Sequence, residues 1–230
     1  MKQHKYLKIT ISLILLIALI TAASIFLSYN VLKVRTFSYE TDKAVDPVRA
    51  VVISDLHEHE FGKDNVKLVE KIREQEPDII LMVGDFVNQD STESTVAVKL
   101  VEQLSKLAPV CYSLGNHKES YMAKTDWNFP AEIEKAGAHF LDKEYVDMDI
   151  RGTKLRIGGM FSYAFGADGK DSAAAAPEDV KNFLMDFQDT DRLKIMMAHR
   201  PDSFIFGDAA SVWDVDLAVS YTHLTLPTTE

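Results

Sequence analysis

The hydrophobic residues of this 230-residue chain form one long run near the N-terminus and a series of short runs after it. Residues 9–32 carry no charge and consist mainly of Ile, Leu and Ala. As a helix rising ~1.5 Å per residue, this run would span roughly 36 Å, enough to cross a hydrocarbon layer of ~30 Å. We therefore predict a transmembrane anchor at residues 9–32, between a basic flank at residues 1–8 and a polar tether at residues 33–47.

Short apolar runs recur after the tether, and each has the length of a strand that is covered on both faces. The five strands predicted in this way are residues 48–53, 78–83, 110–114, 193–198 and 215–220. A hairpin is also predicted, from residues 144–150 and 154–157 on either side of Arg151-Gly152.

Helical patterns separate these strands. Asp64 is expected to cap the first helix, whose buried positions include Val66. The other predicted helices are residues 97–107 and 177–188. Residues 162–176 are rich in Ala and are predicted to form a surface loop. This order of strands and helices predicts an α/β sandwich domain at residues 48–220, with parallel strands at its centre.

Charge narrows the possible partners. The formal net charge is −10, which argues against a protein that holds nucleic acid through its phosphates. It does not argue against phosphorylated small molecules, because bound cations reverse the local field. Cys111 is the only cysteine, so the chain has no intrachain disulfide.

The charges that flank the apolar run bear on topology. Three lysines precede the run, while Lys33 and Arg35 follow it. We therefore expect the N-terminus on the cytoplasmic side of the cell membrane and the domain on the other side. A cleaved signal peptide is the alternative, with Thr21-Ala22-Ala23 as its small-residue site. The apolar run continues to Leu27, which favours the uncleaved single-pass anchor.

Polar side chains follow four of the predicted strands directly. They stand in Asp55-Leu56-His57, Gly84-Asp85, Gly115-Asn116-His117 and His199. The carboxyl ends of strands are where ligands bind in open α/β sheets. Carboxylate, amide and imidazole groups are ligands for Mn, Fe or Zn ions, and two such ions ~4 Å apart can share one carboxylate. The sequence therefore predicts a centre of two divalent metal ions at this edge.

This series of motifs resembles the calcineurin-like metallophosphoesterases, whose pattern is Asp-x-His, Gly-Asp, Gly-Asn-His, a lone His and Gly-His-x-His. The resemblance covers residues 48–220 and is closest to the membrane-anchored bacterial-type branch. It implies a metallophosphatase-like α/β/β/α sandwich. Two positions depart from the pattern, because Asn88 stands where many members have a second acid and Lys118 where many have Glu.

The resemblance also implies a role for each matching residue. Asp55 and His57 would hold the first metal, Asp85 would bridge, and Asn116 and His199 would hold the second; the catalytic residue would be His117. A hydroxide held between the metals would attack phosphorus in line, and His117 would protonate the leaving alkoxide. Arg200 is a candidate for binding the substrate phosphate, with a surface salt bridge as its alternative.

The last motif of the pattern is absent from its expected place. After residue 220 the chain reads Tyr221-Thr222-His223-Leu224 instead of Gly-His-x-His. We interpret residues 221–230 as a non-native tail and the domain as C-terminally incomplete, with His223 a doubtful replacement ligand in a shifted register. On this interpretation each metal lacks one histidine, and we expect weak metal binding and slow turnover.

The leading hypothesis is a membrane-anchored, two-metal phosphoesterase that hydrolyses a phosphomonoester, phosphodiester or pyrophosphate. Its substrate would be a phosphorylated small molecule or a lipid-linked phosphate. An amide hydrolase would use similar ligands, but the order of the motifs favours phosphoryl chemistry. The non-enzymatic alternative is a membrane-tethered module, or an inactive fragment of the enzyme, that binds metal or phosphate without turnover.

Overall fold

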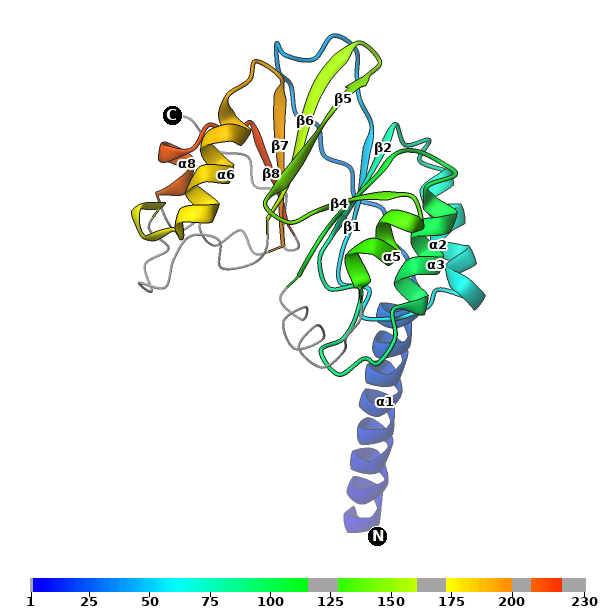
Figure 1. The fold of residues 1–230 in the computed structure, drawn as a ribbon. Helices are drawn as coiled ribbons and strands as arrows, with labels where there is room; N and C mark the ends of the chain where they lie inside the picture. The colour runs from blue at the N-terminus through cyan, green and yellow to red at the C-terminus, as the bar shows by residue number, and fades with distance from the viewer. Residues whose placement is uncertain (1, 116–127, 161–172, 200–207, 221–230) are drawn as a thin grey trace. The chain divides into compact units, whose positions relative to one another are not determined.

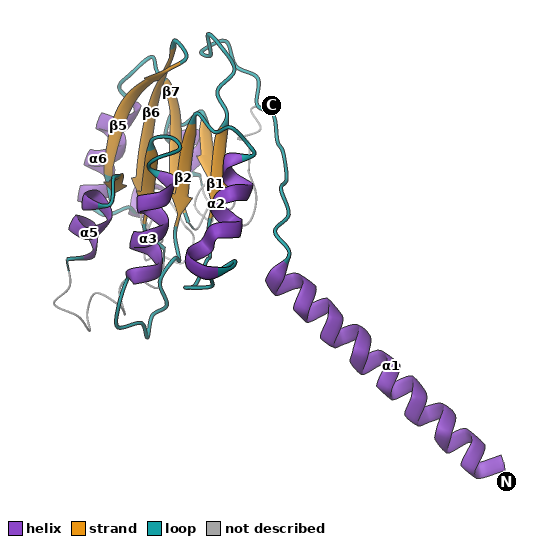
Figure 2. Cartoon of the chain, turned by 90° about the vertical axis from the view of Figure 1, so that its right-hand side faces the viewer, coloured by secondary structure: helices purple, strands orange, loops and turns teal. Residues whose placement is uncertain are grey.

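The computed structural model describes residues 2–115, 128–160, 173–199 and 208–220. The chain divides into two compact units, Met1–Thr36 and Phe37–Glu230. The first unit contains one helix, α1 (Lys2–Asn30), which Figure 2 shows as a single continuous rod. Its segment Lys8–Leu27 is long and apolar enough to cross a membrane, a property that a signal sequence shares.

The second unit is built on two four-stranded sheets (Figure 1). The strands of the first sheet are all parallel and pair in the order β1 (Ala50–Ile53), β2 (Ile79–Val83), β3 (Val110–Ser113) and β4 (Ala138–Leu141). In the second sheet the order is β5 (Glu144–Ile150), β6 (Thr153–Met160), β7 (Leu193–Ala198) and β8 (Leu217–Val219). Strand β5 is antiparallel to β6, and the other pairs are parallel.

Helices cover the outer face of each sheet, as both ribbon views show (Figures 1 and 2). Those on the first sheet are η1 (Lys63–Asn65), α2 (Val66–Arg73), α3 (Thr95–Leu104) and α5 (Phe129–Lys135). Those on the second sheet are η2 (Ala173–Ala175), α6 (Glu178–Gln188) and α8 (Ala209–Val212). The predicted α/β/β/α sandwich is therefore confirmed.

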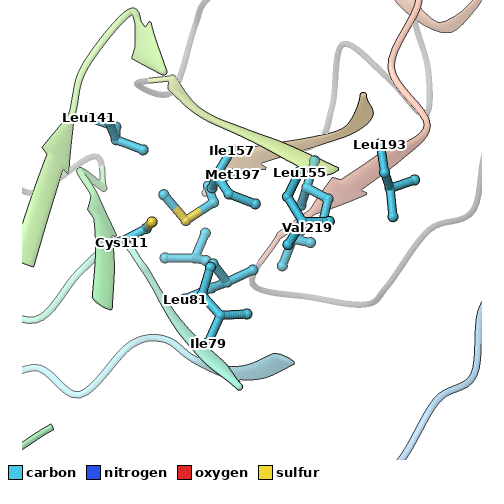
Figure 3. Packing of buried hydrophobic residues seen from close by; sticks show 11 residues of the cluster. Ile79, Leu81, Cys111, Leu141, Leu155, Ile157, Leu193, Met197 and Val219 are labelled. Atoms are coloured by element: carbon cyan, nitrogen blue, oxygen red, sulfur yellow. The ribbon is translucent and has the colours of Figure 1, made fainter. Parts of the chain in front are cut away.

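The core between the two sheets follows from the alternation of side chains along each strand. In β2, Ile79, Leu81 and Val83 point into a buried cluster that also contains Ile157 and Met197 of the second sheet (Figure 3). The alternate residue Met196 of β7 instead packs with the buried face of α6. Strands β2 and β7 are thus buried on both faces, as expected for short apolar runs inside a sandwich.

Three local predictions were wrong. Asp64 does not cap α2: Asn65 occupies the N-cap position without a side-chain cap, and Asp64 pairs with Lys99. Val66 is exposed, because the buried face of α2 consists of Leu68, Val69 and Ile72. Strand β1 is only half-buried rather than covered on both faces, because it stands at the edge of its sheet among the strands described.

Two elements and part of one loop were also not anticipated. Helix α5 and strand β4 fall in a part of the chain for which no element was predicted. Residues 161–172, most of the predicted surface loop, lie outside the described residues. Its described end is part helical, because Ala173–Ala175 form η2; Ala174 and Ala175 are exposed, whereas Ala173 and Ala176 are buried and the amide of Ala173 donates to Asp208.

Residues 43–46 of the predicted tether contact the second sheet. The Nζ of Lys43 lies 2.8 Å from both carboxylate oxygens of Asp216, next to β8. The amide of Val45 donates to Oγ1 of Thr153 at 2.9 Å. The segment before β1 is therefore fastened to the domain at these points.

Candidate metal centre

Three strands bring acidic and imidazole side chains to one place. Asp55 follows β1, Asp85 follows β2 and His199 follows β7, each at the carboxyl end of its strand. One ligand atom from each of the three lies within 4.8 Å of the others. The Nε2 of His199 is 3.1 Å from Oδ2 of Asp85 and 4.0 Å from Oδ1 of Asp55.

Glycines make this close approach possible. A Cβ on Gly84 would lie 2.3 Å from Nδ1 of His199, and a Cβ on Gly115 would lie 2.1 Å from Oδ1 of Asp85. Gly84 also has a φ of +75°, which other residues rarely adopt. These two positions therefore need glycine because any larger residue would occupy the space taken by the neighbouring ligand side chains.

The backbone around the centre has an unusual conformation. Asp55, His57 and Asp85 have φ values of 53°, 47° and 53°. Positive φ is uncommon outside glycine, costs free energy and clusters at functional sites. The amide of Asp55 donates to Gly84 at 3.2 Å and that of His57 to Asp85 at 3.0 Å. These bonds hold the turns after β1 and β2 against each other.

The orientation of His199 is fixed by a backbone carbonyl. Its Nδ1 lies 3.1 Å from the carbonyl oxygen of Val83. A carbonyl only accepts hydrogen bonds, so Nδ1 carries the proton and donates. Nε2, the atom nearest Asp85, is then the nitrogen available as a ligand.

Burial and mutual charge shift the pKa values of two of these groups. Burial raises the pKa of Asp55 above its usual range, the charge of Asp85 adds to this, and Ser54 and His199 oppose it. Burial lowers the pKa of His199, but the hydrogen bond and charge of Asp85 outweigh that effect, so the pKa of His199 is raised overall. A divalent cation bound by Asp55 and Asp85 would relieve the repulsion between their two carboxylates.

His57 lies beside this group rather than within it. Its Nε2 is 3.6 Å from Oδ1 of Asp55, and its side chain is 38% exposed. Its Nδ1 lies 3.2 Å from Oδ1 of Asn88. Sequence reasoning assigned no role to Asn88, nor to Ser54, whose hydroxyl lies against Oδ2 of Asp55 and 2.7 Å from the carbonyl of Val83. A serine directly before the first ligand was the available signal.

Four predicted site residues lie outside the described part of the chain. They are Asn116, His117, Arg200 and His223. Gly115, which precedes Asn116, lies against Asp85 at the end of β3. The residues that are described fit a divalent cation, because the carboxylates of half-buried Asp55 and buried Asp85 converge with the imidazole of His199 in the mixture that Mn, Fe and Zn ions accept.

Comparison with known proteins agrees with this geometry. A family model described as calcineurin-like phosphoesterase matches residues 48–223. An uncharacterized metallophosphoesterase of Campylobacter jejuni is 25% identical over 232 residues, which cover 96% of this chain and 58% of the relative. The chain thus spans less than two thirds of that relative's length.

Among solved structures, the phosphopantetheinyl hydrolase PptH from Mycobacterium tuberculosis is similar in fold. The TM-score is 0.50 at 15% sequence identity, over 75% of this chain and 81% of the other. The resemblance inferred from the motifs is confirmed by the family model, which covers most of the chain. The chain belongs to the calcineurin-like phosphoesterase family.

Proposed function

We propose that the chain is a metal-dependent phosphoesterase that hydrolyses a phosphomonoester, phosphodiester or pyrophosphate at a centre of two divalent cations. The observation that supports this is the convergence of Asp55, Asp85 and His199 from three strands and two sheets. A helix-capping or turn-closing role would explain one of these residues but not their meeting point. Family membership supports phosphoester hydrolysis as the reaction class.

Each residue has a proposed task. Asp55 and His57 would hold one cation, Asn116 and His199 would hold the other, and Asp85 would serve both. Bound cations of this kind lower the pKa of coordinated water towards ~7 and neutralise phosphoryl charge. The protein keeps its ligands in place with the Val83 carbonyl, which orients His199.

Two further residues are proposed to act on the substrate. His117 donates its proton to the leaving oxygen as the phosphorus–oxygen bond breaks, a contribution of about 10²–10⁴-fold. Arg200 holds a phosphoryl oxygen through its guanidinium. His223 is retained only as a candidate ligand.

The test of the reaction uses p-nitrophenyl phosphate and bis-p-nitrophenyl phosphate with added Mn²⁺. We expect hydrolysis that a chelator abolishes and that Asp85→Asn reduces strongly. Asp90→Asn is the matched control, because Asp90 is an exposed acid on the loop after the same strand. Equal rates in the wild type and Asp85→Asn would refute the proposal, and metal binding without turnover would favour the non-catalytic module.

His117 is tested by the leaving group. His117→Ala should retain Mn²⁺ and hydrolyse p-nitrophenyl esters better than alkyl esters, because a poor leaving group needs the proton more. Loss of bound metal in this variant, in proportion to activity, would contradict the assignment.

We further propose that α1 anchors the chain in the cell membrane with the domain outside the cytoplasm. Support comes from its apolar 20-residue segment Lys8–Leu27 and from the lysines at the N-terminal side of that segment. Extraction with alkaline carbonate should leave the full chain in the membrane pellet. N-terminal sequencing of the mature protein decides against the anchor if it starts after Ala23.

An anchored site would favour a lipid-linked phosphate over a soluble phosphorylated small molecule. The two are separated by comparing one headgroup presented in vesicles and as a free ester. A preference of the full chain for the vesicle form, lost when α1 is removed by cleavage in the tether, would support the lipid-linked substrate. Equal rates in both forms would support the soluble one.

A further inference from the structure

Asn88 uses its whole side chain on the segment that carries His57. Its Oδ1 lies 3.2 Å from Nδ1 of His57. Its Nδ2 donates to the carbonyl oxygen of His57 at 3.2 Å and to Oε2 of Glu58 at 2.8 Å. Its backbone amide donates to Oγ of Ser91 at 3.0 Å, which fixes the position from which the side chain extends.

These contacts settle which way the Asn88 amide points. The carbonyl of His57 and the carboxylate of Glu58 are both acceptors, so they must face the donor Nδ2. The opposite orientation would place Oδ1 against two acceptors and lose both hydrogen bonds. Oδ1 is therefore the atom that faces the ring of His57.

The amide orientation in turn determines the tautomer of His57. Oδ1 of Asn88 only accepts, so Nδ1 of His57 must carry a proton and donate to it. The neutral ring then has its lone pair on Nε2, the nitrogen that lies 3.6 Å from Asp55. Which ring nitrogen binds a metal is set by the hydrogen bond of the other.

Asn88 also supports the strained turn on which His57 stands. His57 and Glu58 have φ values of 47° and 60°. Their amides donate to Asp85 and to Phe86 at 3.0 Å each, and Asn88 adds a bond to the carbonyl of His57. The same residue thus constrains both the backbone and the ring of the predicted ligand.

We propose that Asn88 is a positioning residue that selects the Nδ1-protonated tautomer of His57 and presents Nε2 as a metal ligand. This inference deepens the proposed function and rests on it for the metal. Its first consequence concerns only the ring of His57, so it is measured without metal and without substrate.

The test is long-range ¹H–¹⁵N correlation on metal-free, ¹⁵N-labelled full chain in detergent. In the wild type we expect His57 mainly protonated on Nδ1. Asn88→Ala should shift the ring towards the Nε2-protonated form and weaken Mn²⁺ binding by about 10–100-fold. In Asn88→Asp the carboxylate still accepts from Nδ1, so the tautomer should be retained and the loss of affinity should be smaller.

Asn182→Ala is the matched control, because Asn182 is an exposed asparagine of α6, and it should change neither reading. A wild-type ring protonated on Nε2 would overturn the proposal, and so would Asn88→Ala with unchanged tautomer and unchanged Mn²⁺ affinity. If Asn88→Ala does not fold, the His57 tautomer measured in the wild type and in Asn88→Asp decides whether the proposal holds. A tautomer that responds in a protein without phosphoesterase activity would uphold the positioning role while refuting the function.

Discussion

The Nε2 of His199 lies 3.1 Å from Oδ2 of Asp85, although β7 and β2 belong to different sheets. Both side chains are 4% exposed, so this contact is formed away from solvent. Because the pair bridges the two layers, the candidate metal centre requires the sandwich to be assembled. Metal binding and folding of this domain are therefore expected to be linked.

Asp85→Asn tests that linkage. The substitution preserves size but removes the charge that lies between the proposed cations, so Mn²⁺ affinity should fall by at least about 100-fold, beyond the effect typical of an outer-sphere partner. Equilibrium dialysis with metal analysis measures it. Asp90→Asn, the exposed acid of the same loop, should retain wild-type affinity, and a similar loss in both variants would contradict the assignment.

Gly84→Ala separates space from backbone conformation. Gly84 and Gly152 have nearly equal φ values of +75° and +78°, but a Cβ on Gly84 would lie 2.3 Å from Nδ1 of His199, whereas one on Gly152 would meet Val45 at 3.6 Å. Gly152→Ala should cost about 1–2 kcal/mol of unfolding free energy, the penalty for positive φ alone.

Gly84→Ala should cost more than Gly152→Ala and should also weaken Mn²⁺ binding, because His199 must move. Urea denaturation and metal titration of both variants measure the two effects. Equal destabilisation of the two variants, with intact metal binding in Gly84→Ala, would show that His199 needs no such space.

The pKa values of His199 and Asp55 are both raised in the folded protein. They predict that the stability of the metal-free protein falls with rising pH, whereas that of the Mn²⁺-bound protein rises. In the metal-free protein, the proton on His199 is stabilised by folding. That stability is fully present below the unfolded pKa of 6.5 and is lost as the pH rises through the higher folded pKa. With Mn²⁺ the ligands must be deprotonated, so stability should rise over the same range.

Thermal unfolding between about pH 6 and about pH 8 measures these trends. In the metal-free protein the midpoint should fall as the pH rises, and with Mn²⁺ it should rise. His199→Asn should flatten both curves. If the unfolding midpoint changes with pH in the same direction with and without Mn²⁺, then protons and metal do not compete for His199.

Strand interiors and strand ends were the parts of this protein that sequence reasoning predicted well. A run such as that of β2 is buried on both faces, so its residues have little choice of structure, and Asp85 at its end is placed by the sheet itself. For the same reason the sequence predicted that Asp55 and His199 would reach the same edge. The strand order was not predicted from the sequence; in the structure, successive parallel strands lie side by side within each sheet.

Local capping and packing were harder to predict, because tertiary contacts override local preference. Asp64 has the chemistry of a cap, but Lys99 of α3 binds it instead. Strand β4 has only four residues, and its exposed His139 interrupts the apolar run that would have marked it as buried. The role of Asn88 depends on its contact with the ring of His57. The two residues are far apart in the sequence, and no sequence pattern indicates that they meet.

The contact between Lys43 and Asp216 predicts how the segment before β1 is held. Asp216 also accepts from the backbone amide of Lys194, so one carboxylate joins that segment to β7. The hydrogen bond and charge of Asp216 outweigh burial and raise the pKa of Lys43. Lys43→Gln should release the segment at a cost of up to about 1 kcal/mol.

Limited proteolysis detects this release as cleavage within residues 37–47 that is up to about fivefold faster. Lys33→Gln is the control, because Lys33 is exposed and precedes the second unit. If the protease cleaves Lys43→Gln and the wild type at the same rate, the ion pair does not hold the segment.

Cys111 offers a probe of the whole sandwich. It is fully buried between the two sheets, close to Leu81 and Met197 in the core cluster (Figure 3), and burial raises the pKa of its thiol to about 12. Only the thiolate reacts with iodoacetamide, so the folded chain should remain unlabelled near neutral pH and should react at the rate of a free thiol in concentrated guanidinium. Mass spectrometry counts the label.

Mn²⁺ should slow labelling further in partly denaturing urea, because a ligand that binds only the folded state stabilises it. Gly84→Ala, with its displaced ligand, should lose that protection by Mn²⁺, whereas Gly152→Ala should keep it. Rapid labelling of the native chain would mean that the sheets separate readily, and a centre built between β2 and β7 would then not be held together long enough to act.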